Sequence, residues 1–178
     1  MKRPVRVILY VIGAILALLA IMGWVGSMLP REHVAASTIT LEAPADSVWQ
    51  VVRDLGAVPS WWRDMKGAER VAGASRETWR YRDRFNSPMP LEVLDEEPYR
   101  LVLRIATEGG PFGGTWTYDV EATDTGGARA TVTEVGWIAN PFFRVMARTV
   151  LGYHATLDSY LGALGRRFGA EVVPTHVR

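Results

Sequence analysis

The stretch that decides the fold is NPFFRVMARTVLGYHATLDSYLGALGRRF, residues 140–168. Pro141 stands where the first residue of a helix belongs, because the N–H that proline lacks would have no partner there. Apolar side chains then recur every three or four residues, which places them on one face of a helix: Met146, Val150, Tyr153, Leu157, Leu161, Leu164 and Phe168. We predict one long helix whose apolar face needs a broad apolar surface to cover it.

The residues before this helix supply that surface as a series of strands. Apolar and polar residues alternate, as in half-buried strands, at 33–42, 78–85, 89–94, 100–107, 115–122 and 129–138, and a shorter strand is predicted at 69–72. Two short helices, at 44–55 and from Pro59, follow the first strand. Because the strands cluster instead of alternating with helices, the sequence indicates the α+β class with a mostly antiparallel sheet.

Composition excludes several kinds of site. The chain has no cysteine, so disulfides and thiolate metal sites are impossible. The three histidines lack the spacing of a zinc site, and we predict no metal and no cofactor. Three basic residues lie in the first six positions, and the remaining 17 basic residues stand against 19 acidic ones. This balance argues against a nucleic-acid partner.

The N-terminus has the pattern of a membrane-spanning helix. Residues 7–29 carry no charge, and 23 residues rising about 1.5 Å each can cross a hydrocarbon core of about 30 Å. Lys2, Arg3 and Arg6 precede the run, so the positive-inside rule predicts a cytoplasmic N-terminus and an extracytoplasmic domain. A cleaved signal peptide is the alternative, although its apolar core is normally about 7–15 residues long. We predict a retained single-pass anchor in residues 1–30, a globular domain in 31–170 and a flexible tail in 171–178.

Several short motifs in the globular part occur in the order of a known superfamily. They are Pro44-Ala45-Asp46-Ser47-Val48-Trp49, the segment from Asp54 through Pro59 to Trp61, Glu97-Pro98-Tyr99-Arg100-Leu101, and the strand pair 115–118 and 130–134. With these motifs, residues 31–168 resemble the START-like (SRPBCC) superfamily, specifically its polyketide cyclase/dehydrase and lipid-transport branch. The resemblance implies a helix-grip fold, in which an antiparallel sheet curves around the C-terminal helix and leaves a cavity between them. One such scaffold hosts many functions, so it implies a fold more than an activity.

The strand alternation and the helix period predict which side chains line that cavity. The candidates are Trp61, Trp79, Tyr81, Phe85, Leu103, Ile105, Phe112, Trp116, Tyr118, Met146, Val150, Tyr153 and Leu157. We expect Trp61, Trp62 and the glycine-rich stretch 109–114 near the mouth. The last strand has two readings, one with Trp137 inside the cavity and one with Glu134 inside. Each of these residues taken alone could equally be part of a packed hydrophobic core. The large number of aromatic side chains among them favours a ligand site.

Three residues are candidates for acid–base chemistry. Asp83 shares the parity of Tyr81, which points it inward in a regular strand, whereas a strand end would return it to water. Glu134 faces the cavity in one of the two readings. His154 lies four positions before Asp158, so the two can form a catalytic pair or an ordinary solvated pair on a helix face.

These observations favour a membrane-tethered domain that binds a hydrophobic small molecule or lipid in the cavity. The resemblance implies an alternative, a cyclase- or dehydratase-like enzyme that uses Asp83, Glu134 or His154 as its acid or base. A further alternative is an envelope interaction module whose cavity is filled by its own side chains. The sequence leaves the identity of the ligand and the oligomeric state open.

Overall fold

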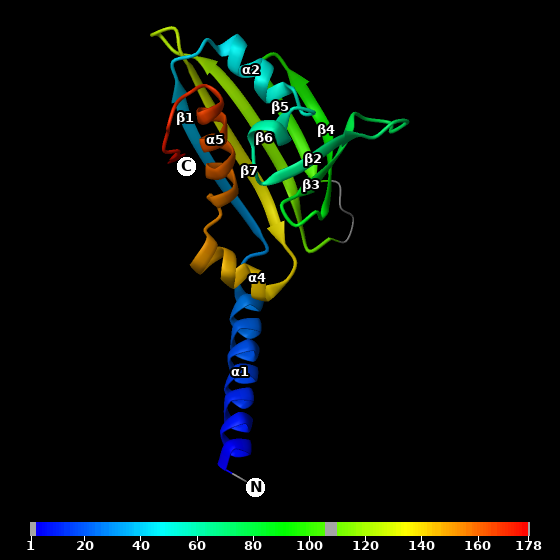
Figure 1. Cartoon of the computed structure of the whole chain (residues 1–178), viewed down its shortest axis with the longest axis vertical. Coiled ribbons are helices and arrows are strands. Elements are labelled where there is room, and N and C mark those ends of the chain that lie inside the picture. The colour runs from blue at the N-terminus through cyan, green and yellow to red at the C-terminus, as the bar shows by residue number, and fades with distance from the viewer. Residues whose placement is uncertain (1–2, 106–109, 178) are drawn as a thin grey trace.

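The computed structural model describes residues 3–105 and 110–177 (Figure 1). The elements in chain order are α1 (Arg3–Met28), β1 (Glu32–Leu41), α2 (Ala45–Arg53), α3 (Val58–Trp61), β2 (Met65–Arg70), β3 (Thr78–Asp83), β4 (Pro88–Glu97), β5 (Arg100–Ile105), β6 (Phe112–Ala122), β7 (Ala128–Ile138), α4 (Pro141–Met146), the π-helical turn η1 (Ala147–Leu151), α5 (Ala155–Arg167) and β8 (Thr175–Val177). The strands form one sheet in the order β2-β3-β4-β5-β6-β7-β1-β8, and each pair of neighbours is antiparallel. The predicted α+β class with a curved antiparallel sheet is confirmed.

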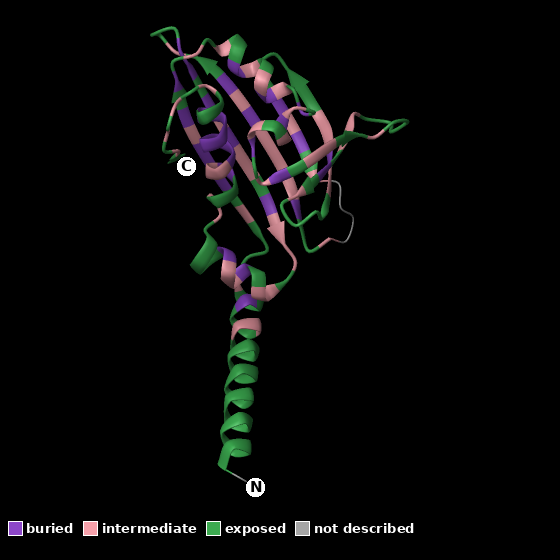
Figure 2. Cartoon of the chain, in the orientation of Figure 1, coloured by how far each residue is buried: buried purple, intermediate pink, exposed green. Residues whose placement is uncertain are grey.

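The core lies between the sheet and two helices. Figure 2 shows buried residues where α5 and α2 face the sheet, and exposed residues along almost all of α1. Leu157, Leu161 and Leu164 of α5 are completely buried against this core, as is Val48 of α2. Burial of a leucine-sized side chain is worth about 1.5–3 kcal/mol, so this layer of α5 holds the helix on the sheet.

The register of β7 decides which face of the last strand points inward. Ala130 and Val132 are buried, Arg129 is exposed, and Glu134 continues the buried parity. Trp137 has the opposite parity, and its indole ring lies over Gly113 on the neighbouring strand β6. The reading that places Glu134 inside is therefore the one that the structure adopts.

The predicted single helix from Asn140 to Phe168 is wrong, because this stretch folds as α4, η1 and α5. The chain breaks at Gly152, whose φ of 75° and ψ of 151° fall where a side chain is strained. Before the break, the segment packs mainly against α1 and contacts the sheet at β7. A Cβ on Gly26 would lie 2.0 Å from the carbonyl oxygen of Pro141, so the two helices touch through their backbones.

Alanine at Gly152 and alanine at Gly162 are expected to change stability in opposite directions. Gly152→Ala forces a side chain into its positive-φ conformation and should cost about 1–3 kcal/mol. Gly162 lies inside α5, and a Cβ there would meet nothing closer than the end of the Arg166 side chain at 3.5 Å. Gly162→Ala should therefore stabilise by up to about 1 kcal/mol. Thermal unfolding of the full chain in lipid nanodiscs measures both changes, and shifts of the same sign would contradict the break at Gly152.

An ion-pair network joins the end of α2 to the sheet. Arg53 donates to Glu77 at 2.8 Å in a partly buried contact and to Glu96 at 2.6 Å in an exposed one. The hydrogen bond from Arg53 holds the pKa of Glu77 below the ordinary carboxyl value of 4.5, although desolvation opposes this shift. A lowered folded-state pKa stabilises the fold above the ordinary carboxyl pKa, and this stabilisation is lost as the pH falls through the lowered value.

Glu77→Gln should therefore destabilise the protein by about 1–2 kcal/mol near neutral pH. The difference from the parent protein should shrink as the pH falls below the ordinary carboxyl range and through the lowered pKa of Glu77, because the parent carboxylate then becomes protonated. Glu69→Gln is the matched control, since Glu69 pairs with Arg80 in an exposed contact at 3.5 Å. Thermal unfolding against pH checks this. An effect of Glu77→Gln that stays constant from neutral to acidic pH would contradict the assignment.

Three smaller features can be compared with the prediction. The short strand expected at 69–72 is β2 at Met65–Arg70. The strand expected at 100–107 is seen as β5 up to Ile105, and positions 106–109, including the start of the glycine-rich stretch, lie outside the described residues. The end of the chain, expected to be a flexible tail from 171, contains β8, which pairs with the open edge of β1. Without β8, this edge of β1 would present unpaired backbone N–H and C=O groups, which explains why it accepts a further strand.

Candidate ligand cavity

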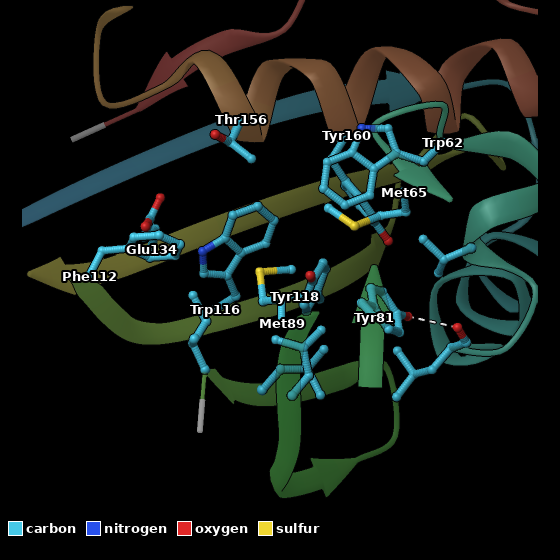
Figure 3. Close-up of a pocket in the computed structure, with 15 residues that line it drawn as sticks. Trp62, Met65, Tyr81, Met89, Phe112, Trp116, Tyr118, Glu134, Thr156 and Tyr160 are labelled. Atoms are coloured by element: carbon cyan, nitrogen blue, oxygen red, sulfur yellow. Dashed lines mark hydrogen bonds between the residues drawn. The ribbon is translucent and has the colours of Figure 1, made fainter. Parts of the chain in front are cut away.

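A cavity of about 170 Å³ lies between α5 and the sheet (Figure 3). Six of the side chains predicted to line it do so: Tyr81, Leu103, Ile105, Phe112, Trp116 and Tyr118. They come from β3, β5 and β6, whose alternation points one set of side chains toward α5. Glu134 of β7 joins them.

Other wall residues were not predicted from the sequence: Thr156 and Tyr160 on α5, Met65 on the edge strand β2, and Met89 on β4. Trp62, which was expected near the mouth, lines the wall just after α3. The period of α5 would have indicated Tyr160, because it lies three positions before Ala163 and four before Leu164 on the buried face. Nothing in the alternation of the strands could have separated Trp62, which lines the cavity, from its neighbour Trp61, which does not.

Tyr160 organises the aromatic wall of the cavity. Its ring lies edge-on to Trp62 with centroids 5.2 Å apart, and its centroid is 5.3 Å from that of Tyr118. The indole N–H of Trp62 donates to Ser159 at 3.1 Å, and Ser159 donates to Asp64 at 2.5 Å, which fixes the Trp62 ring. Burial raises the pKa of both Tyr118 and Tyr160, so both hydroxyls stay protonated at neutral pH.

The far end of the cavity is closed by Tyr81. Its hydroxyl donates to the carbonyl oxygen of Leu55 at 2.7 Å, and the ring is almost fully buried. Burial raises the pKa of Tyr81 well above its ordinary value, because the charged form would have no water around it. This end is therefore a fixed, neutral wall.

The opposite end of the cavity is polar. Glu134 is the charged residue among the described side chains that line the walls, and 17% of its side chain is exposed. The strand register places it directly opposite Trp116 on β6 and Ala35 on β1. His33 approaches from β1, with its Nε2 atom 3.7 Å from a carboxylate oxygen of Glu134. Its ring stacks on Tyr153 with centroids 4.3 Å apart.

The mouth lies at this polar end. Phe112 is 49% exposed and Thr156 is also exposed, whereas the walls near Tyr81 are buried. Figure 3 shows Phe112, Glu134 and Thr156 together at one end, with Tyr81 at the other. Phe112 pairs with Ile138, close to the start of α4, so the mouth faces the end of the domain from which α1 projects (Figure 1).

Residues 32–168 match the sequence profile of the family described as polyketide cyclase / dehydrase and lipid transport. The chain belongs to this family. No curated protein sequence matches it. Solved structures with the same fold include the following three.

A conserved protein from Geobacillus kaustophilus has a TM-score of 0.65 at 15% identity, covering 82% of this chain and 100% of its own. A START superfamily protein from Mycobacterium smegmatis has a TM-score of 0.63 at 16% identity, covering 77% and 97%. The Zhui aromatase/cyclase from Streptomyces sp. R1128 has a TM-score of 0.60 at 17% identity, covering 76% and 95%. At these identities the likeness establishes the START-like fold alone, which confirms the resemblance seen in the sequence.

Several aromatic candidates lie outside the cavity of this START-like domain. The indole N–H of Trp79 donates to Glu77, and its ring packs over Gly56. Phe85 is 75% exposed because it follows the end of β3, where Arg84 lies over its ring. Trp137 is on the other face of the sheet. Trp61 packs behind the wall, with its ring centroid 5.3 Å from that of Tyr160.

The helix candidates are displaced by the break at Gly152. Val150 is 66% exposed, and Met146 lies on α4, which packs against α1. Tyr153 stacks on His33 beside the polar end without lining the walls. Leu157 is completely buried in the core and does not reach the cavity. A single straight helix would have put these four side chains on one face. Because the helix is interrupted at Gly152, they do not share a face.

Two of the three acid–base candidates do not reach the cavity. Asp83 accepts hydrogen bonds from the backbone N–H groups of Phe85 and Ser87 at 2.9 and 2.7 Å, so it closes the turn after β3 instead of pointing inward. His154 contacts Ser37 at 3.2 Å and stacks on His176, on the β8 side of α5. Ser37 is completely buried and donates to Asp158, so no substrate can reach it as a nucleophile. Glu134 alone of the three lines the cavity.

Proposed function

We propose that this START-like domain takes a small apolar molecule into the cavity beneath α5, and that α1 holds it at a membrane with the mouth toward the bilayer. The observation that carries the proposal is the cavity itself, which is walled by rings, methionines and aliphatic side chains and is open at one polar end. Apolar walls with a few polar groups are typical of small-molecule sites.

The size of the cavity limits the ligand. An apolar cavity of roughly 150 Å³ holds a benzene molecule, and this one has about 170 Å³. A single substituted ring or a short chain therefore fits, whereas a two-chain lipid needs the walls to move apart. An aromatic group that buries about 150–200 Å² gains about 4–5 kcal/mol, which corresponds to a Kd of roughly 0.2–1 mM.

Two features support the membrane tether. α1 is long and apolar enough to span a bilayer, and it is almost entirely exposed apart from its contact with α4. Where α4 leads into η1, Phe143, Val150 and Leu151 expose their apolar side chains. This group lies on the anchor side of the domain and fits contact with the interfacial layer of the membrane.

The proposed topology places the globular domain outside the cytoplasm, because three basic residues lie at the N-terminal end of the chain, before the uncharged run of α1. The chain has no cysteine, so one introduced at Ser75 in the β2–β3 connection provides a unique label. A maleimide that cannot cross membranes should label this position in intact cells. Labelling only after lysis would show that the domain lies in the cytoplasm. Recovery of a soluble chain that lacks α1 would show that α1 is a cleaved signal peptide and not an anchor.

Binding can be tested with propylbenzene and the full chain in lipid nanodiscs, with empty nanodiscs titrated as the blank. Met89→Trp fills the cavity from β4 and should weaken propylbenzene binding about tenfold or more. Met146→Trp makes the same substitution on α4, outside the cavity, and should leave the affinity within about twofold. Failure of propylbenzene to bind above the blank, or equal effects of the two variants, would refute the proposal.

A cyclase- or dehydratase-like activity is a second candidate, because one carboxylate, that of Glu134, lines the cavity. Such a base would remove a proton from the carbon between two carbonyl groups and leave an enolate. Exchange of that hydrogen of 1-phenyl-1,3-butanedione for deuterium from D2O reports this step. If Glu134 is the base, Glu134→Gln should slow the exchange about 100-fold or more. Exchange no faster than the uncatalysed rate in the parent protein would remove this candidate.

A further inference from the structure

The polar end of the cavity holds a hydrogen-bond donor and an acceptor that do not satisfy each other. The indole Nε1–H of Trp116 is buried and has no hydrogen-bond partner among the described residues. Among the described residues, Glu134 has one ion-pair contact within 4 Å, which is with His33. The distance from His33 Nε2 to the carboxylate oxygen is 3.7 Å, which is too long for a hydrogen bond. Figure 3 shows the nitrogen of Trp116 on the side of its ring that faces Glu134.

The backbone around these groups keeps them in place. Trp116 and Glu134 are direct partners in the antiparallel register of β6 and β7, so their side chains project from the same face at neighbouring positions. Gly136 leaves room beside them. A Cβ at this position would lie 2.7 Å from the His33 ring and 3.0 Å from a carboxylate oxygen of Glu134. The absence of a side chain at Gly136 therefore allows Glu134 and His33 to lie together at the mouth.

A buried donor without a partner is costly, and such groups in folded proteins usually have a reason. A ligand group placed between Trp116 and Glu134 must accept a hydrogen bond from the indole and donate one to the carboxylate. A hydroxyl does both. A carbonyl offers nothing to Glu134, an ammonium group cannot accept from the indole, and a carboxylate is repelled by Glu134.

We propose that this polar end selects ligands that carry a neutral hydroxyl group on a small apolar body, such as a substituted phenol, and rejects carboxylates of the same shape. The inference rests on the proposed function, since it names the class of ligand for the same cavity. The apolar walls bind the body of the ligand, Trp116 and Glu134 bind its hydroxyl, and the exposed Thr156 hydroxyl lies beside them at the mouth.

Three probes of one shape test the selection: 4-propylphenol, propylbenzene and 4-propylbenzoate. They are titrated into the full chain in nanodiscs near pH 8, where a phenol with a pKa of about 10 is neutral and an imidazole is largely uncharged. We expect the phenol to bind about tenfold tighter than propylbenzene, and the benzoate to bind more weakly than propylbenzene. In NMR spectra, the indole N–H resonance of Trp116 can be assigned because it is lost in Trp116→Phe. This resonance should shift when the phenol is added and stay nearly unchanged when propylbenzene is added.

Variants separate the two hydrogen bonds. Trp116→Phe keeps a ring in the wall but removes the donor, and should lower the affinity for the phenol about fivefold or more relative to the affinity of the same variant for propylbenzene. Trp137→Phe removes an indole N–H from the other face of the sheet and should change neither affinity. Glu134→Gln removes the negative charge and should improve binding of the benzoate about tenfold.

The outcomes distinguish this inference from the proposed function. Propylbenzene binding with no preference for the phenol would overturn the hydroxyl selection and leave the apolar cavity standing. Tightest binding of the benzoate would also overturn the selection, because it would show that Glu134 does not repel an anion at the mouth. Absence of binding by all three probes would overturn both proposals.

Discussion

Replacing Arg144 with methionine is expected to loosen α1 from the domain and to lower the unfolding temperature more than a change at any exposed arginine. Arg144 is 6% exposed, which is unusual for an arginine. Its guanidinium donates to the carbonyl oxygens of Ile138 at 2.8 Å and Ala139 at 2.6 Å, and to those of Gly26 and Leu29 at 3.1 and 3.3 Å. It therefore joins the end of α1 to the segment between β7 and α4.

Methionine keeps most of the bulk of the side chain and removes these donors. Four carbonyl oxygens then lose charged partners in a shielded position, which should cost about 3 kcal/mol or more. The C-terminal end of α1, where the helix dipole is negative, also loses a favourable positive charge. For a chain of this length the loss corresponds to a fall in Tm of about 6–12 °C. Thermal unfolding of the full chain in nanodiscs measures it, and hydrogen exchange should rise first in α4.

Arg148→Met is the matched control, because Arg148 lies one turn further on and is exposed. Its effect should stay within about 0.5 kcal/mol. Similar effects of the two substitutions would show that Arg144 does not bind the end of α1 in solution. Faster exchange confined to α5 would be equally incompatible with the observed contacts.

Truncating Leu157 to alanine is expected to be among the most destabilising single changes within α5. Leu157 is completely buried in the core formed with the sheet. Removing its side chain leaves a void that close-packed neighbours fill only partly, at a cost of about 2–5 kcal/mol. The corresponding fall in Tm is about 4–20 °C, again measured by thermal unfolding of the full chain.

Leu151→Ala is the control for this change, since Leu151 is 61% exposed in η1. It should alter stability by no more than about 0.5 kcal/mol. A loss below about 1 kcal/mol for Leu157→Ala would mean that the side chain already borders empty space, as the sequence predicted when it placed Leu157 at the cavity wall.

Much of the cavity could be predicted because strand alternation is a local property. Once one residue of a strand is known to face inward, its second neighbours do so as well. This relation gave Leu103 with Ile105 on β5, and Trp116 with Tyr118 on β6. It fails at strand ends, where Asp83 closes a turn and Phe85 is exposed. It is also silent on connections, so Trp62 could not be distinguished from Trp61.

The sequence by itself determined the α+β class, the apolar length of α1 and the inward parity of the middle strands, because each depends on the spacing of neighbouring residues. Tertiary structure decided the face of β7, the break at Gly152 and the position of Glu134 at the mouth. The apolar face that begins at Met146 does not continue onto the sheet, because α4 packs against α1 while Val150 and Leu151 of η1 are exposed. The spacing along a helix therefore shows which side chains share a face, whereas the surface that buries them depends on segments far away in the chain.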